Sequence, residues 1–127
     1  MNSTVGICEQ AAGVGPYTAN VTGARISKIG PSGFRTTVVD NLPSSQTNAD
    51  SGSLISGVAD VAFIGDKLYA VLGGAGCSHG VPTVPNGVIR VRGSSWGLIA
   101  NLSIFLMNHP VANPNPDDFE RMERGIA

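Results

Sequence analysis

Alternation of apolar and polar residues with a period of two runs through most of this chain and predicts β-strands. Residues 25–29 (RISKI) alternate in this way, and residues 34–39 (FRTTVV) are rich in aromatic and β-branched side chains. The Pro-Ser-Gly sequence between them has the composition of a turn. Residues 24–42 are therefore predicted to form a hairpin, preceded by a loop-rich segment at 1–23.

Four further strands are predicted after a polar loop at residues 43–57. They are expected near 58–64, 67–72, 88–92 and 96–100, separated by a Gly-Asp turn, a Gly- and Pro-rich loop at 73–86 and a Gly-Ser-Ser turn. The first two are apolar enough to predict burial of both faces. Phe63, Tyr69 and Trp96 fall on strand positions and are expected to pack within this unit.

A helical pattern is confined to one place, near residues 102–109, where LSIFLMN precedes Pro110. Proline removes a backbone donor and ends a helix. The Pro-rich sequence that follows predicts an irregular tail, so residues 103–127 are expected to be a short helix and then irregular chain.

A degenerate repeat relates the two strand groups. Ile26-Ser27-Lys28-Ile29 matches Val88-Ile89-Arg90-Val91, and each is followed by a turn, a strand and an Asn-Leu pair, at Asn41 and Asn101. Residues 58–102 are thus predicted to be one complete four-stranded antiparallel unit, and residues 24–42 the second half of a preceding unit. Repeated four-stranded units with Gly-rich turns are the blades of a β-propeller, which closes with about 4–8 of them.

The sequence therefore predicts an all-β fragment of an antiparallel β-propeller, about one and a half blades long. Such a fragment leaves strand edges open, at 24–29 and at 96–100. Open edges favour pairing with another copy of the chain.

Charge and hydropathy narrow the classes of partner. The formal net charge is −1, from 8 basic and 9 acidic residues, which gives no reason to expect nucleic acid or an anionic membrane as partner. No apolar run approaches the ~20 residues that a membrane-spanning helix needs. The first ten residues have neither the basic start nor the apolar core of a signal peptide.

Residues with metal-binding or catalytic potential are few. Cys77 and His79 form a Cys-X-His pair, which suits a metal site or a nucleophile–base dyad, but the only other Cys and His are Cys8 and His109. We therefore expect loop residues bonded to backbone, and assign no catalytic residue and no metal ligand.

Acidic and amide side chains give the candidates for a ligand-facing surface. The carboxylates considered for calcium are Asp60, Asp66, Asp117, Asp118 and Glu120, without EF-hand spacing. Asp66 is interpreted as a turn residue. Asn86 either faces the axis of a propeller or forms an Asn-Gly turn. His79, Asn86 and Asp60 remain as candidate ligand-facing residues.

Two modifications depend on the compartment. Glycosylation sequons occur at Asn2, Asn20 and Asn101, of which Asn2 and Asn20 are the candidate acceptors in an exported protein. The two cysteines permit one disulfide, and two free thiols suit a cytosolic protein equally well.

The run GVADVAFIGDKLYAVLGGAGCSHGVPTVPNGVIRV, residues 57–91, resembles the ScyD/ScyE family of SMP-30/NHL-like β-propeller proteins. The similarity continues through residues 15–29, 37–45 and 102–120. The tetrapeptide CSHG and the run HPVANP make it specific. The resemblance implies a six-bladed propeller several hundred residues long, of which this chain, similar to a plant-type member, corresponds to a truncated part.

The propeller pattern and the lack of a coherent set of catalytic residues favour a non-catalytic binding or scaffold module of unknown ligand, not functional alone. The alternative, by analogy of fold, is part of a Ca-dependent SMP-30/lactonase-like or strictosidine-synthase-like hydrolase or lyase, in which carboxylates and Asn hold the ion at the propeller axis. The resemblance implies an extracellular or periplasmic location, which supports a Cys8–Cys77 disulfide.

The C-terminal residues depart from that resemblance. After DDFE the family continues in a sequence such as PDGTWYSM, whereas this chain reads RMERGIA. Deleting one base from a possible coding string for the first sequence produces the second. Our hypothesis is therefore that residues 121–127 are frameshifted sequence, and the alternative is an ordinary charged, exposed tail.

Overall fold

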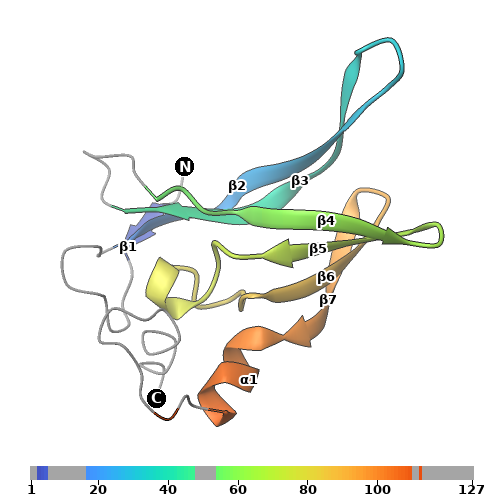
Figure 1. Ribbon diagram of the computed structural model, residues 1–127. Coiled ribbons are helices and arrows are strands. Elements are labelled where there is room, and N and C mark those ends of the chain that lie inside the picture. The colour runs from blue at the N-terminus through green and yellow to red at the C-terminus, as the bar shows by residue number, and fades with distance from the viewer. Residues whose placement is uncertain (1–2, 6–16, 48–53, 110–111, 113–127) are drawn as a thin grey trace.

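The computed structural model describes residues 3–5, 17–47, 54–109 and 112 of the 127-residue chain. Within them the regular structure is antiparallel β, in two sheets, with one short α-helix and a 3-10 turn (Figure 1). The prediction of an all-β chain with a short helix is therefore confirmed.

The first sheet is built on a long hairpin. Strands β2 (Thr18–Ile29) and β3 (Arg35–Gln46) pair along their whole length, and β1 (Ser3–Val5) pairs with the first residues of β2, so the order is β1-β2-β3. The register of β1 spans only residues 18–20 of β2. In the described part of the chain, the predicted open edge at 24–29 therefore has no strand partner on that side.

This hairpin is longer than the predicted one. Residues 18–23 were expected in a loop-rich segment and residues 43–46 in a loop, but both are strand. Thr18 pairs with Gln46 and Asn20 with Ser44, beyond an irregular stretch of the ladder that contains Pro43. Proline is tolerated in a sheet at a bulge. The residues that follow Pro43 are polar, so this part of the strand has no hydrophobic pattern by which to predict it.

The second sheet is a four-stranded meander. Its strands follow chain order: β4 (Val58–Ile64), β5 (Lys67–Leu72), β6 (Gly87–Arg92) and β7 (Ser95–Asn101). The predicted four-stranded antiparallel unit over 58–102 is confirmed, with strand limits within a residue of those expected.

The core lies between the two sheets. One face of β5 and β6 packs against β2 and β3, and the buried residues at this interface are Ile26, Val39, Leu42, Ala70, Leu72, Ile89 and Val91. Trp96 of β7 packs against this core, as expected, and its Nε1 donates a hydrogen bond to the carbonyl oxygen of Asn41, at 3.2 Å. Apolar burial between two sheets thus holds the unit together.

The predicted burial of both faces of β4 and β5 is wrong. In β4 every residue after Val58 is exposed, and in β5 only Ala70 and Leu72 are buried. Phe63, expected to pack inside the unit, is 70% exposed. The physical reason is that only one face of the sheet is covered by β2 and β3.

Two short helical elements adjoin the second sheet. The 3-10 turn η1 (Cys77–His79) lies in the loop between β5 and β6. Helix α1 (Leu102–Asn108) follows β7 directly, and Asn101 caps it, because its Oδ1 accepts a hydrogen bond from the Ile104 backbone N–H at 2.9 Å.

Candidate functional site

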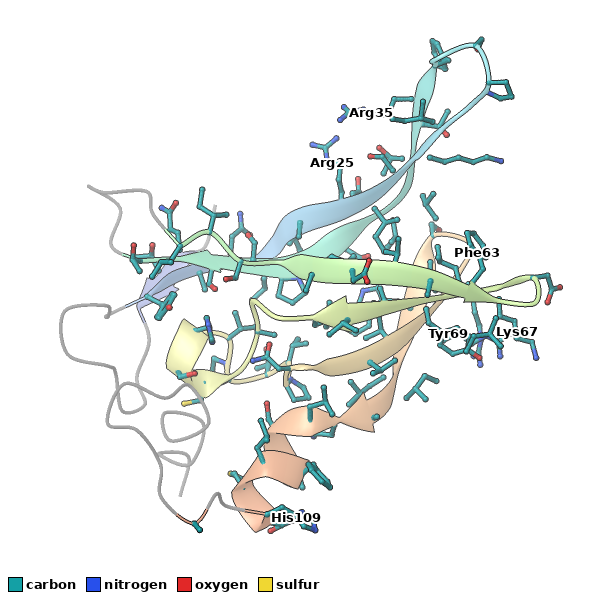
Figure 2. The ribbon with its side chains drawn as sticks, in the orientation of Figure 1. Arg25, Arg35, Phe63, Lys67, Tyr69 and His109 are labelled. Carbon is teal, nitrogen blue, oxygen red and sulfur yellow. The ribbon has the colours of Figure 1, made fainter. Side chains whose placement is uncertain are left out.

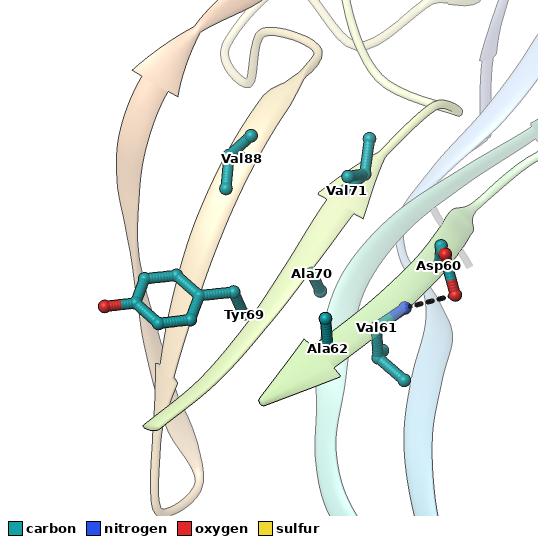
Figure 3. A pocket seen from close by; sticks show the side chains of 7 residues that line it. All are labelled: Asp60, Val61, Ala62, Tyr69, Ala70, Val71 and Val88. Carbon is teal, nitrogen blue, oxygen red and sulfur yellow. Dashed lines mark hydrogen bonds between the residues drawn. The ribbon is translucent and has the colours of Figure 1, made fainter. Parts of the chain in front are cut away.

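The uncovered face of the β4–β7 sheet carries a shallow, mostly apolar hollow, which we call the open face. Side chains alternate along a strand, and the register pairs Val71 with both Asp60 and Val88, and Tyr69 with Ala62. These five residues, with Val61 and Ala70, line a hollow of about 200 Å³ (Figure 3). Its lining suits an apolar partner surface more than a polar ligand.

Polar groups lie at the margins of the open face. Asp60 is exposed, and its Oδ1 accepts a hydrogen bond from the Val61 backbone N–H at 2.8 Å. Arg90 lies opposite Tyr69 in the register and is half-buried. Among the described residues, its Nε has no hydrogen-bond partner, although a buried donor left unpaired is costly.

The internal repeat relates the open face to a face that is covered. Ile26 corresponds to Val88 in the repeat; Ile26 pairs with Val39 across its hairpin, and Val88 pairs with Ala100. Ile26 and Val39 are buried beneath the second sheet, whereas Val88 is half-buried and Ala100 is exposed. The open face is therefore the repeat counterpart of the surface that β5 and β6 cover on the first hairpin.

The loop between β5 and β6 holds a second, buried group. His79 is 4% exposed, its ring centroid lies 4.5 Å from that of Tyr17, and its Nδ1 lies 3.2 Å from Ser78 Oγ. Burial raises the pKa of the Tyr17 hydroxyl above its ordinary value. The side chain of His79 is packed inside the loop rather than presented to solvent.

Cys77 is disulfide-bonded. The only other cysteine of the chain is Cys8, which lies outside the described residues. A disulfide sulfur is not a thiolate, so in this state Cys77 is neither a nucleophile nor a strong metal ligand.

Asn86 fastens the same loop to the start of α1. Its side-chain oxygen accepts from the Ala75 N–H at 2.9 Å, and its N–H donates to Ser103 Oγ at 3.1 Å. Its carbonyl oxygen accepts from the N–H groups of Leu102, at 3.0 Å, and Ser103, at 3.3 Å. Asn86 therefore holds the backbone in place where β6 begins.

The three candidate ligand-facing residues do not converge. Asp60 lines the open-face hollow, whereas His79 and Asn86 belong to the β5–β6 loop and do not line it. A second hollow of about 240 Å³ lies between that loop and α1; its lining includes Cys77, Asn101 and Met107. The two polar side chains that line it, Asn101 and Ser103, already stabilise the fold, because Asn101 caps α1 and Ser103 accepts a hydrogen bond from the backbone of Asn86.

The remaining candidates are Asn20, Asp66 and four residues outside the described part of the chain. Asn20 is half-buried, and its Oδ1 accepts from the N–H of Thr22, at 3.0 Å, and from its hydroxyl, at 3.2 Å. Asp66 lies in the β4–β5 turn beside Gly65, whose φ is 64°. Four predicted candidates lie outside the described residues, together with the 121–127 segment: Asn2, Asp117, Asp118 and Glu120.

Two kinds of feature are absent from the described residues. They contain no group of three or more His, Cys, Asp or Glu side chains placed to hold a metal ion. No helix in the same part of the chain is long and apolar enough to cross a membrane.

Comparison of the chain with protein-family models, with curated proteins and with solved structures found no significant match.

The residues that form the open face were not among the predicted site residues, apart from Asp60. Val71 was missed because residues 67–72 were expected to be buried on both faces, and Val88 and Arg90 were predicted only as members of a strand. The internal repeat was the available signal, since it pairs the covered Ile26 with Val88.

Proposed function

We propose that this chain is a non-catalytic scaffold or binding module, a piece of a β-propeller of the ScyD/ScyE type. Its open face docks a further β-sheet, in the way that β5 and β6 dock on the first hairpin. The supporting observation is the repeat relation between Ile26, which is buried, and Val88, which is half-buried and lines the open-face hollow.

The chemistry of the open face supports sheet packing. Small and branched side chains such as Ala62, Val71 and Val88 suit the interdigitation of two packed sheets. Large exposed apolar patches mark interaction sites in proteins.

The proposed function places the protein in an oxidising compartment. The disulfide at Cys77 supports it, because disulfides persist mainly in secreted and periplasmic proteins.

Sedimentation velocity over a concentration series tests the docking surface. We expect the wild-type chain to self-associate, because a second copy is the available apolar partner in a purified sample. Val71→Lys/Val88→Lys places two charges on the open face and should shift the chain to monomer. The control, Val21→Lys/Ile55→Lys, changes residues of similar or greater exposure away from that face and should associate like wild type. Equal behaviour of the two variants would refute the proposal.

Calcium and lactones test the scaffold interpretation against a catalytic one. We expect no change of melting temperature on adding calcium or a chelator, and no lactone hydrolysis. A calcium-dependent rise of the melting temperature together with turnover would replace the scaffold by an enzyme.

A further inference from the structure

The ends of two hairpins carry the most exposed large apolar side chains near a turn. Ile29 and Phe34 flank the β2–β3 turn, and Phe63 and Ile64 precede the β4–β5 turn. All four are between 67% and 74% exposed. Two large apolar side chains are thus exposed together at each turn, and grouped apolar exposure is typical of interaction sites.

Tight turns hold these side chains in fixed positions. The N–H of Gly30 donates to the carbonyl of Phe34 at 2.9 Å, and the N–H of Gly33 donates to the carbonyl of Gly30 at 2.9 Å. Gly33, with φ of 83°, and Gly65, with φ of 64°, adopt the left-handed conformation that such turns require. The apolar residues are thus presented by ordered hairpins.

A cation lies directly opposite an isoleucine in each hairpin. Arg35 pairs with Ile29 across the first hairpin, and Lys67 pairs with Ile64 across the second. Each tip also has a phenylalanine next to one member of that pair, Phe34 beside Arg35 and Phe63 beside Ile64. The same combination of one aliphatic, one aromatic and one basic residue therefore occurs twice.

The basic residues of the described part of the chain all lie in hairpins. They are Arg25, Lys28 and Arg35 in the first, Lys67 in the second, and Arg90 and Arg92 in β6. Only three carboxylates accompany them there, Asp40, Asp60 and Asp66. Both hairpin ends project away from η1, the first toward the top of Figure 1 and the second to its right, and Figure 2 shows Arg35 at the first hairpin and Lys67 at the second. Asp66 lies beside Lys67 in the β4–β5 turn, so the excess of positive charge is at the end of the first hairpin, where Lys28 and Arg35 flank the turn.

We propose that the β2–β3 and β4–β5 hairpin ends bind the surface of an anionic lipid bilayer. Aromatic and aliphatic side chains enter the boundary between headgroups and acyl chains, while cations beside them meet anionic headgroups. A lysine or arginine can extend its charge to the headgroup level from beside a buried apolar residue. The inference rests on the exposure and charge of the hairpin ends and is independent of the proposed docking of sheets.

Vesicle flotation of the full chain tests this proposal. The probes are phosphatidylcholine vesicles and vesicles of three parts phosphatidylcholine to one part phosphatidylserine. We expect the chain to float with the anionic vesicles only and to be released by salt, because surface electrostatics are screened. Protein aggregates sediment in this experiment and are not mistaken for bound protein.

Matched variants assign the binding to the hairpin ends. Phe34→Ser/Phe63→Ser should lower the partition coefficient about tenfold or more. Arg35→Gln/Lys67→Gln should lower it by about fivefold for each charge removed. Leu54→Ser/Ile55→Ser removes two exposed apolar side chains elsewhere and should bind like wild type.

The penetration depth gives a second readout. A Phe34→Trp variant should gain fluorescence that shifts to shorter wavelength on anionic vesicles and is quenched by brominated acyl chains. Failure of the folded wild-type chain to float, or an equal loss in the Leu54→Ser/Ile55→Ser control, would overturn the proposal. Self-association could still be intact in that case, which separates this result from the test of sheet docking.

Discussion

At the scale of single residues, the close approach of β6 and β7 depends on Gly87. A Cβ at this position would overlap the carbonyl oxygen of Ala100, whereas a Cβ at Gly97 would meet nothing within 4 Å. The neighbouring atom is backbone, so it cannot rotate away.

Gly87→Ala is therefore expected to destabilise the fold by about 1–3 kcal/mol, as an overpacked site does. Gly97→Ala, in the paired strand, is the matched control and should change stability by less than about 0.5 kcal/mol. Urea unfolding followed by circular dichroism measures both. Equal stability of the two variants would show that β6 and β7 are not this close.

At the scale of elements, the core lies at the interface between the β2–β3 hairpin and strands β5 and β6. Leu42 is fully buried there, whereas Phe63 is 70% exposed at a hairpin end. The larger side chain is thus the less important one for stability.

Leu42→Ala should cost about 2–5 kcal/mol of stability, because it leaves a cavity between the sheets. Phe63→Ala should change stability by no more than about 0.5 kcal/mol. The same urea experiment measures both. A larger loss for Phe63→Ala would mean that the uncovered part of β4 belongs to the core.

The elements were predictable where a short run of apolar or alternating residues meets clear turns. Strands β4, β5, β6 and β7 satisfy that condition, and helix α1 was predicted from the run LSIFLMN before Pro110. The first hairpin was predicted too short, because Pro43 and its serine neighbours carry no hydrophobic signal while they pair through the backbone.

The candidate site was less predictable than the elements. An apolar strand has the same sequence whether both faces or only one is covered, so Val71 and Val88 could not be recognised as open. The roles of Asn86 and His79 depend on contacts between a loop and distant elements, such as the packing of His79 on Tyr17. No local pattern of residues reports such contacts.

At the scale of the whole molecule, a covalent bond ties the β5–β6 loop to another part of the chain. If Cys77 pairs with Cys8, the bond closes a loop long enough to stabilise the fold by roughly 4 kcal/mol in the chain-entropy model. Reduction should then lower the melting temperature, and mass spectrometry should find two added hydrogens. The Cys77→Ser variant should melt at the temperature of the reduced chain. A reductant-insensitive melting temperature would contradict this expectation.

Either of two surfaces of the whole molecule can carry self-association. A sheet can associate through its open face, at Val88, or through its edge strand, at Ile99 of β7. Both residues are accessible in part, so a photoreactive leucine analogue can be placed at either position.

Photo-cross-linking of the two labelled chains at equal concentration decides between face and edge. Stacking of sheets predicts covalent dimers from the label at Val88 and few from the label at Ile99. Dimers from Ile99 alone, or none from either label at concentrations where the chain sediments as a dimer, would contradict the account.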